Sequence, residues 1–467
     1  IPNNNIEIIN ESNGDEDDIN VDRPTGVSLM GGDDGSFGPD AKVTIPIVQD
    51  DGSIKEEVYT GDQAVFMKEI QMYKDAFNGC MSLTGAIPEA LFANNTKVTT
   101  FANTFKDCIS LEEITIPSTV TSIGSYAFQS SGLTQITIST SVTSIGEFAF
   151  NKCGSLTKIE VVQGNPKYSD NDGVLFETAT KTLIAYPIGN TRTSYTIPTG
   201  TKIIEKNAFE GSKLKTLILN SELETIRSNA FLNSAILSEL HYPTKEIEYD
   251  SSIMEGCVGL RTVKIIGVGE NKMTDWTSSQ EQAWYEVRDK ITTIIFDDNV
   301  KHVGSYAFEG TTGLTGSTSI TWGGITTIGL YAFSGSGIQS VEITESITSI
   351  GTMAFGSCLS LTTVKHSIKE ITTTGDVFTG STGLNRIEFT STTEGNMPDY
   401  TETKKPTWYS IRKQIKTCLL DLNMPNVNGF DVMDYFKEKG FFVRTPVAII
   451  SGAEDEVSLD KAKAYPI

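Results

Sequence analysis

Five of the six cysteines occupy one recurring position, so their chemistry has to be considered together. Each follows a core aromatic residue or methionine by three residues, in the segments FNGC, FKDC, FNKC, MEGC and FGSC; they are Cys80, Cys108, Cys153, Cys257 and Cys358. Disulfides or a zinc site would need cysteines that converge in pairs, and the chain has no C-x-x-C motif. Because one repeat position implies one environment, we predict buried thiols that pack as small apolar groups.

The three histidines form no acid–base or metal-binding pattern. His241, His302 and His366 fall in three different copies of a repeat, with no Ser-His-Asp order and no metal-binding helix around them. We therefore predict structural or solvated histidines. The sequence predicts no catalytic residue, no metal site and no cofactor.

A polar segment at about 268–290 brings three aromatic residues together. Trp276, Trp284 and Tyr285 are weak candidates for a binding site, because Trp and Tyr are favoured anchors in interfaces. The alternative is that these side chains pin the segment onto the rest of the protein. Both interpretations remain open at the level of the sequence.

The elements that would position these groups come from one repeated frame. It runs L-x-x-I-x-I, a turn, V-x-x-I-G-x-x-A-F, and then x-x-C or x-x-S. Regular copies centre on Phe128, Phe150, Phe209, Phe231, Phe308, Phe333 and Phe355, and less regular copies centre on Phe77, Phe105, Met254 and Phe378. Adjacent copies lie 22 to 25 residues apart, a period that is typical of a solenoid.

One copy shows why the frame has to repeat. The segment around Ile114 and Ile116 alternates and is β-branched, so it predicts a short strand whose isoleucines point inward. Gly124 is expected to allow a tight turn, and Phe128 to fill the space between layers. Each copy offers six to eight apolar groups, each worth roughly 2 kcal/mol when buried. Because a single copy cannot bury them, we expect each copy to cover the one before it.

Two interruptions divide the repeat, and each predicts an insert. Between Phe150 and Phe209 the spacing is 59 residues, and the extra segment, with DNDG and TATK turns, predicts a β-hairpin. The polar segment described above predicts a helical insert. The sequence thus predicts four regions: an acidic disordered linker at 1–40, an N-terminal cap region at 41–74, repeats at 75–417, and a separate tail at 418–467. The repeats contain the hairpin insert at about 163–190 and the helical insert at about 268–290.

The repeated I-G-x-x-A-F core and the DGVLF…LIAYP hairpin resemble the BspA-like leucine-rich repeat family, also called Treponema-type repeats. The resemblance covers about 75–415. It implies a β-rich α/β solenoid, a right-handed rod with a parallel sheet on one face, followed here by a small α/β tail. Members of that family are typically bacterial or protist surface proteins that bind host proteins, matrix or other cells, and the family has no catalytic residues to carry over.

The tail resembles a different family, the receiver domain of bacterial response regulators. The segment LLDLNMPNVNGF is similar to its phospho-acceptor strand, and TPVAIISGAED is similar to its next strand. The resemblance implies Asp421 as the phosphorylated residue and Ser451 as a group that contacts the phosphoryl oxygens. The first and last strands of such a domain are missing, so we expect no phosphotransfer. We also expect that CLLDL pairs as a last strand of the rod, with a fusion or recombination junction near 415–418.

Composition narrows the partners. The net charge is −22, which disfavours nucleic acid and anionic lipid, and no apolar run is long enough to span a membrane. Residues 1–40 contain ten acidic side chains against one arginine. The chain begins IPNNN, as a processed product without its export signal would, and we expect a secreted or cell-surface location.

Three functions follow as hypotheses. The first is a non-catalytic protein that binds host or cell-surface proteins or glycans, with an undetermined oligomeric state. The second is an intracellular two-component signalling protein that uses Asp421. The third is a carbohydrate-active enzyme in the aromatic insert, for which Glu281 and Glu286 form no convincing carboxylate pair.

Overall fold

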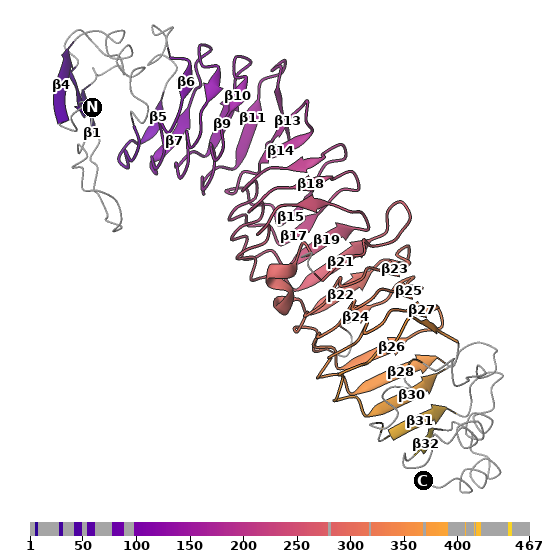
Figure 1. The fold of residues 1–467 in the computed structure, drawn as a ribbon. Helices are drawn as coiled ribbons and strands as arrows, with labels where there is room; N and C mark the ends of the chain where they lie inside the picture. Colours follow the sequence, from indigo (N-terminus) through magenta and orange to yellow (C-terminus); the bar gives the residue numbers. More distant parts are fainter. Residues whose placement is uncertain are drawn as a thin grey trace.

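The computed structural model describes residues 77–87 and 98–390 apart from 279–281, 317–318 and 368–369, together with Thr407, Ile415 and the backbone of six outlying strands. The coils stack into an elongated, gently curved rod with β5 near one end and β30 near the other (Figure 1). The solenoid is built from parallel strands with almost no helix. Within the described part of the chain, no helix is long and apolar enough to cross a bilayer.

One face of the rod carries the strands that the L-x-x-I-x-I segments predict. They are β5 (Gly85–Ile87), β7 (Leu111–Ile114), β9 (Gln135–Ile138), β11 (Lys158–Val161), β15 (Ser194–Thr196), β17 (Thr216–Ile218), β19 (Glu239–Pro243), β21 (Thr262–Ile266), β22 (Thr293–Phe296), β24 (Ile320–Thr321), β26 (Ser340–Ile343), β28 (Thr363–Ser367), β30 (Arg386–Thr390), β31 (Thr417–Asp421) and β32 (Val447–Ile450). Within each sheet of this face neighbouring strands pair in parallel, and from β15 to β21 and from β28 to β30 each residue aligns with its counterpart in the next coil.

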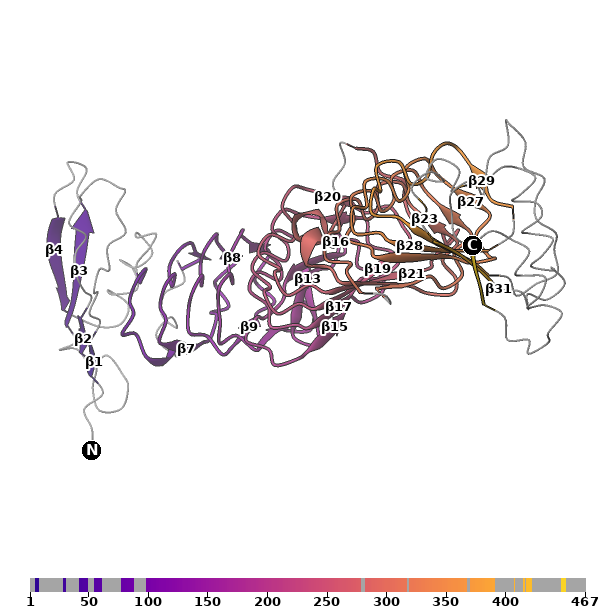
Figure 2. The same cartoon turned by 90° about the horizontal axis from the view of Figure 1, so that it is seen from below.

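A second line of parallel strands runs along the opposite face, where the sequence analysis predicted no sheet. These strands are only two residues long: β6 (Thr100–Phe101), β8 (Ser122–Ile123), β10 (Ser144–Ile145), β16 (Ile203–Ile204), β18 (Thr225–Ile226), β20 (Glu248–Tyr249), β23 (His302–Val303), β25 (Thr327–Ile328), β27 (Ser349–Ile350) and β29 (Thr372–Thr373). Figure 2 shows the two lines on opposite edges of the rod. The prediction of a sheet on one face alone was therefore incomplete.

Aromatic rings stack through the core, one per coil. Ring centroids are 5.3 Å apart for Phe77–Phe105, 5.5 Å for Phe105–Phe128, 5.9 Å for Phe128–Phe150, 5.5 Å for Phe308–Phe333, 5.4 Å for Phe333–Phe355 and 5.8 Å for Phe355–Phe378. All of these rings are buried. Each of these rings covers the next, so the prediction that each coil covers the one before it is confirmed for these coils.

The cysteine position holds a line of hydrogen bonds as well as packed side chains. Buried thiols and hydroxyls at this position donate to the carbonyl of the core aromatic residue in the preceding coil. The bonds join Cys108 to Phe77 (2.9 Å), Cys153 to Phe128 (2.9 Å), Ser234 to Phe209 (2.8 Å), Cys257 to Phe231 (3.1 Å), Cys358 to Phe333 (3.2 Å) and Ser381 to Phe355 (2.6 Å). This explains why Cys and Ser interchange here, which apolar packing alone does not.

The thiols themselves are free, buried and unreactive. Burial raises the pKa of Cys80 and Cys257 to about 12 and that of Cys153 to about 11. A protonated thiol is a donor and a poor nucleophile. The prediction of buried, unpaired cysteines is confirmed for the five that the structure describes.

The glycine of the I-G motif is needed for a reason other than the predicted one. Gly124 has no positive φ, whereas Tyr126, two residues later, has a φ of 57°. A Cβ atom at the equivalent Gly146 would lie 2.3 Å from the backbone nitrogen of Ser125. The motif requires glycine because two coils approach too closely for a side chain.

The first interruption forms the predicted hairpin, with strands β12 (Tyr168–Asn171), β13 (Val174–Glu177) and β14 (Thr182–Ala185). β12 and β13 pair in antiparallel fashion around Asp172 and Gly173, which both have positive φ as this tight turn requires. β14 then pairs in parallel with β16 and rejoins the rod. The buried core divides at this hairpin into two clusters, one from Phe77 to Leu175 and one from Val174 to Ile415.

The chain ends add strands beyond the regular coils. β1 (Asn5–Glu7), β2 (Ser28–Met30), β3 (Lys42–Val48) and β4 (Ile54–Thr60) form an antiparallel sheet, so the expected acidic linker contains two short strands. The rest of 1–40 lies outside the described residues, and its role as a linker stays a prediction. At the other end β31 pairs in parallel with β30, as expected for CLLDL, and β32 follows. The predicted small α/β tail is not shown.

Candidate functional site

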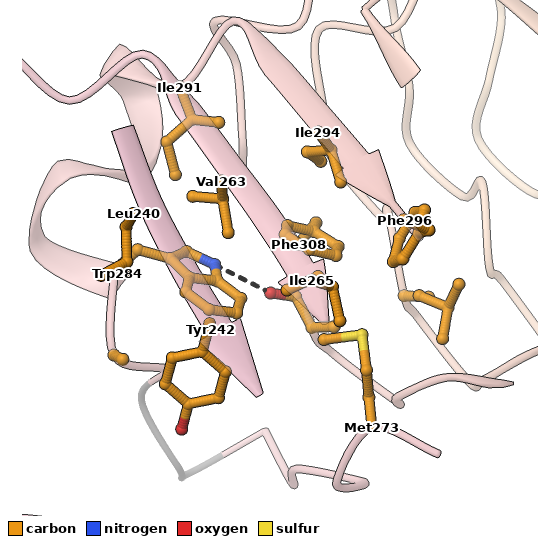
Figure 3. Close-up of a cluster of buried hydrophobic side chains, with 14 of the residues drawn as sticks. Leu240, Tyr242, Val263, Ile265, Met273, Trp284, Ile291, Ile294, Phe296 and Phe308 are labelled. Carbon is orange, nitrogen blue, oxygen red and sulfur yellow. Dashed lines mark hydrogen bonds between the residues drawn. The ribbon is translucent and has the colours of Figure 1, made fainter. Parts of the chain in front are cut away.

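The second insert buries the aromatic residues that the sequence placed there. Trp284 is fully buried and Trp276 is 7% exposed. The indole of Trp284 stacks on Phe308 at 5.1 Å, and its Nε1–H donates to the carbonyl of Ala307 at 3.1 Å (Figure 3). Trp284 thus fills the place that a core phenylalanine has in other coils, which favours the packing interpretation of this cluster.

The predicted helical insert is shorter than expected. Its only helix among the described residues is the 3₁₀ helix η2 (Tyr285–Lys290). Tyr285 remains half-exposed, with the Arg288 guanidinium 3.7 Å from its ring centroid. The Glu286 carboxylate accepts a hydrogen bond from the backbone N–H of Met254 at 2.9 Å, so this acid closes the edge of a coil. Glu281 lies outside the described residues.

The tail residues are placed only through the backbone. Asp421 is the last residue of β31, a strand that continues the rod's own sheet. Ser451 lies outside the described residues. The phospho-acceptor role stays a prediction without support from the fold.

The histidines make separate polar contacts. The Nε2 atom of His241 lies 2.6 Å from a Glu239 carboxylate oxygen, and that of His302 lies 3.2 Å from one of Asp275. His366 is buried, and burial lowers its pKa to about 4. Within the described part of the chain, no three His, Cys, Asp or Glu side chains gather closely enough to hold a metal ion.

A cleft that the sequence analysis did not single out lies beside the hairpin. It has a volume of about 260 Å³ and lies between the coil of Phe148–Lys152, the hairpin and the coil of Glu205–Glu210. Charged side chains from both coils line it, and so does the partly exposed ring of Phe148, which stacks on Tyr126 at 5.2 Å. The cleft coincides with the break between the two core clusters.

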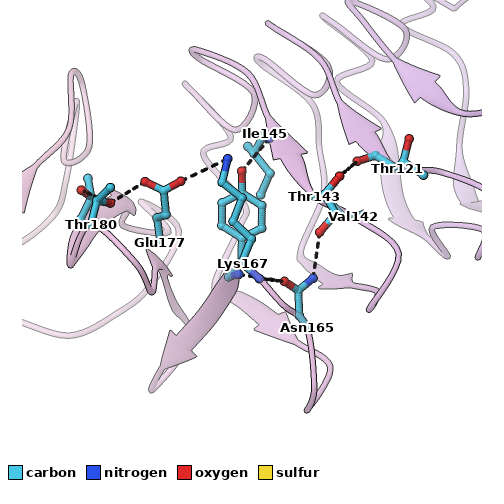
Figure 4. Close-up of polar contacts among 10 residues, drawn as sticks. Thr121, Val142, Thr143, Ile145, Asn165, Lys167, Glu177 and Thr180 are labelled. Atoms are coloured by element: carbon cyan, nitrogen blue, oxygen red, sulfur yellow. Dashed lines mark hydrogen bonds and ion pairs between the residues drawn. The ribbon is translucent and has the colours of Figure 1, made fainter.

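The hairpin wall of the cleft is held by its own polar contacts. The Lys167 ammonium lies 3.2 Å from the Glu177 carboxylate, and Thr180 donates a hydrogen bond to the same carboxylate (Figure 4). The hydroxyl of Thr180 and, after it, the Lys167 ammonium keep the pKa of Glu177 below its usual value, although partial burial opposes them. The hydroxyl of Tyr168 in the hairpin accepts a hydrogen bond from the backbone N–H of Ile145 at 2.9 Å. This bond joins the hairpin to the preceding coil, that of Phe148–Lys152.

Side chains rather than backbone bridge the two coils across the cleft. The Nδ2 of Asn151 donates to a Glu210 carboxylate oxygen at 2.9 Å, and Asn207 donates to the same oxygen. Lys152 lies 3.9 Å from the other oxygen of Glu210. Glu210 is only 7% exposed, so its charge depends mainly on two amide donors. The Oδ1 atom of Asn151 is buried and has no hydrogen-bond partner.

The 59-residue spacing was the sequence signal for this cleft. It predicted a hairpin but could not show that the hairpin replaces part of a coil. Tyr186 takes the place of the core phenylalanine, because its N–H donates to the Ala208 carbonyl at 2.8 Å, as Phe209 does to Ala230. The portion of that coil that would cover Phe148–Lys152 is missing, and the cleft results from its absence.

Comparisons with known proteins agree with this architecture. The sequence matches the BspA type leucine rich repeat region, in six copies, over residues 68–172, 189–315 and 277–397. A comparison with curated proteins found no match. The match to the repeat family ends at residue 397 and lends no support to a receiver domain in the tail.

Solved structures resemble the chain at low identity. A leucine rich cell surface protein of Faecalibacterium prausnitzii is 24% identical over 68% of this chain, with a TM-score of 0.32, and this chain covers 62% of it, less than two thirds. A leucine-rich repeat protein of Eubacterium ventriosum is 22% identical over 68% of this chain and 91% of that chain, with a TM-score of 0.40. One of Bacteroides ovatus is 16% identical over 91% and 98%, with a TM-score of 0.38. On the strength of the family match, which spans most of the repeats, the chain belongs to the BspA-type leucine-rich repeat family.

Proposed function

We propose that the chain is a non-catalytic recognition protein, secreted or held at the cell surface, that binds a protein or glycan ligand. The observation that carries this proposal is the cleft beside the hairpin. It combines a hollow, an aromatic ring, charged side chains and an unpartnered buried acceptor in one place. Such convergence of polar groups in a concave site is typical of ligand binding.

The chemistry of the remaining groups supports binding over catalysis. The five thiols that the structure describes are buried, and four of them donate to carbonyl groups, while Glu286 closes the edge of a coil. In the cleft, the Glu210 carboxylate accepts hydrogen bonds from two amide groups. The two-component alternative is not favoured, because the strand that ends at Asp421 is paired into the rod.

Binding can be tested with the full chain immobilised on a sensor and probed with a glycan array and a peptide array. Saturable binding to one class supports the proposal. The proposal would be contradicted if the chain bound neither array and instead cleaved or modified an arrayed glycan or peptide. Protease treatment of intact producing cells tests the location, since a surface protein should be cleaved while an internal one should not.

A further inference from the structure

The backbone ladder that joins neighbouring coils is open on one side of the cleft. In the coil before it, the N–H groups of Tyr126, Phe128 and Ser130 donate to carbonyl groups of the next coil at 3.0, 2.9 and 2.9 Å. The equivalent donors of that next coil belong to three other residues: Phe148, Phe150 and Lys152. Among the described residues, no atom accepts a hydrogen bond from these three N–H groups.

The second insert shows how the protein closes such an edge when it does so itself. There the Glu286 carboxylate accepts from the N–H of Met254, and the Trp284 indole donates to Ala307 in place of a backbone N–H. The hairpin insert supplies no such group to Phe148–Lys152. Phe150 is buried, Phe148 is partly buried and Lys152 is exposed. Buried N–H groups without partners are rare in folded proteins, so this edge is suited to a ligand that brings its own acceptors.

The spacing of the donors selects the class of ligand. The three N–H groups belong to alternate residues, and in the intact coils they pair with carbonyl groups of alternate residues. Those carbonyl groups belong to turns in which Phe148 and Lys152 have positive φ, so a peptide segment that adopts the same turn conformation presents its carbonyl groups at that interval. Adjacent hydroxyls on a sugar ring lie too close together to match donors two residues apart. Main-chain pairing therefore favours a peptide over a glycan.

The charges select the sequence of that peptide. The Oδ1 atom of Asn151 has no donor, and the nearly buried carboxylate of Glu210 lies beside this residue, held by two amide groups. The lysines of the cleft are already paired: Lys206 lies 3.8 Å from Glu147, Lys167 lies 3.2 Å from Glu177, and Lys152 lies 3.9 Å from Glu210. With a net charge of −22, the whole chain also attracts cations.

We propose that the cleft binds a segment of a protein partner, whose carbonyl groups pair with the N–H groups of Phe148, Phe150 and Lys152 and whose Lys or Arg side chain reaches Glu210 and Asn151. The proposal rests on the recognition function above and names its ligand class. It makes the hairpin insert the specificity element of the rod.

The test uses a positional-scanning library of capped hexapeptides on the full chain. The expected result is enrichment of Lys or Arg at one position, and protection of the amides of Phe148, Phe150 and Lys152 from hydrogen exchange by the best peptide. Glu210→Gln removes one charge at nearly constant volume and should weaken that peptide roughly tenfold or more. Glu309→Gln is the matched control, because Glu309 follows its core phenylalanine as Glu210 does but lies in an intact coil. It should leave affinity unchanged.

The outcomes separate this inference from the broader function. The inference is overturned if a glycan binds and no peptide is selected. It is also overturned if the best peptide binds both variants equally and protects other amides from hydrogen exchange. Either result leaves a recognition function standing. No binding by any probe overturns both. Matching circular dichroism spectra and thermal midpoints of the two variants show that Glu210→Gln remains folded.

Discussion

Phe333→Ala tests the stacking that holds the rod together. Phe333 is fully buried, and its ring centroid lies 5.5 Å from that of Phe308, 5.4 Å from Phe355 and 5.6 Å from Trp322. Truncating a buried phenylalanine costs about 3–5 kcal/mol. Three ring neighbours place this site at the upper end, since each aromatic pair adds about 0.5–1.5 kcal/mol beyond its buried area.

We therefore expect Phe333→Ala to lower the free energy of unfolding by about 4–5 kcal/mol. Each coil contacts only its neighbours, so the loss should begin locally, in the coils of Phe308 and Phe355. The assay is urea denaturation followed by circular dichroism, combined with hydrogen exchange mass spectrometry to locate the coils that open.

Leu359→Ala is the control, because Leu359 is a large apolar side chain that is 69% exposed. Its removal should change stability by about 0.5 kcal/mol or less. A cost below about 1 kcal/mol for Phe333→Ala, or equal costs for the two variants, would refute the reasoning that stacked rings stabilise the coils.

Three further perturbations address other contacts of the rod. Cys153→Ala removes the donor to the Phe128 carbonyl and should lower the free energy of unfolding by about 1 kcal/mol in the same denaturation assay. Cys153→Ser keeps a donor and should retain most of that stability. Equal losses in the two variants would indicate that the thiol contributes by packing alone. Gly146→Ala should lower the free energy of unfolding by about 1–3 kcal/mol, because its Cβ would lie 2.3 Å from the Ser125 nitrogen. Gly154→Ala is the control and should be nearly neutral, because no atom lies within 4 Å of the new Cβ. Thermal midpoints that fall equally in both variants would contradict the close approach of the coils. His366 donates through Nδ1 to the Ser367 carbonyl and accepts from the Thr407 hydroxyl at 2.5 Å. Because its folded pKa of about 4 lies below its ordinary value of 6.5, its contribution of about 3 kcal/mol to the free energy of unfolding is present above pH 6.5 and is lost as the pH falls toward 4. In His366→Gln the urea midpoint should depend less on pH over that window, and an unchanged pH dependence would show that His366 does not make this contribution.

Much of the rod could be predicted from the sequence because each coil repeats the same requirement. The positions of Phe128 and Ile123 recur in every regular copy of the repeat, and both side chains are fully buried. The DNDG turn likewise predicted the hairpin, since its Asp172 and Gly173 adopt the positive φ that such turns need. Where local chemistry decided the structure, the sequence was sufficient.

The sequence was not sufficient where contacts between coils decided the structure. Gly124 was assigned to a turn, but the close approach of neighbouring coils is the reason for glycine there. Cys153 was assigned to apolar packing, but its thiol bonds to a carbonyl 25 residues earlier. Trp284 was a weak binding candidate, but its ring completes the core. In each case the partner lies one coil away, and the repeat pattern does not show which atoms meet.

The cleft was missed for a related reason. Its donors at Phe148, Phe150 and Lys152 have the same residue pattern as donors in intact coils. Their difference comes from what the hairpin omits from the next coil. A spacing of 59 residues between core phenylalanines indicated an insert, and only the folded chain shows that the insert leaves an edge open.

Hydrogen exchange at single-residue resolution tests this open edge most directly. The full chain is compared at six amides, those of Tyr126, Phe128 and Ser130 in the closed coil and those of Phe148, Phe150 and Lys152 at the cleft. The account predicts that the second set exchanges at least about tenfold faster than the first in the unliganded protein. Equal protection of the two sets would show that the edge is closed, and would contradict the cleft as the site of recognition.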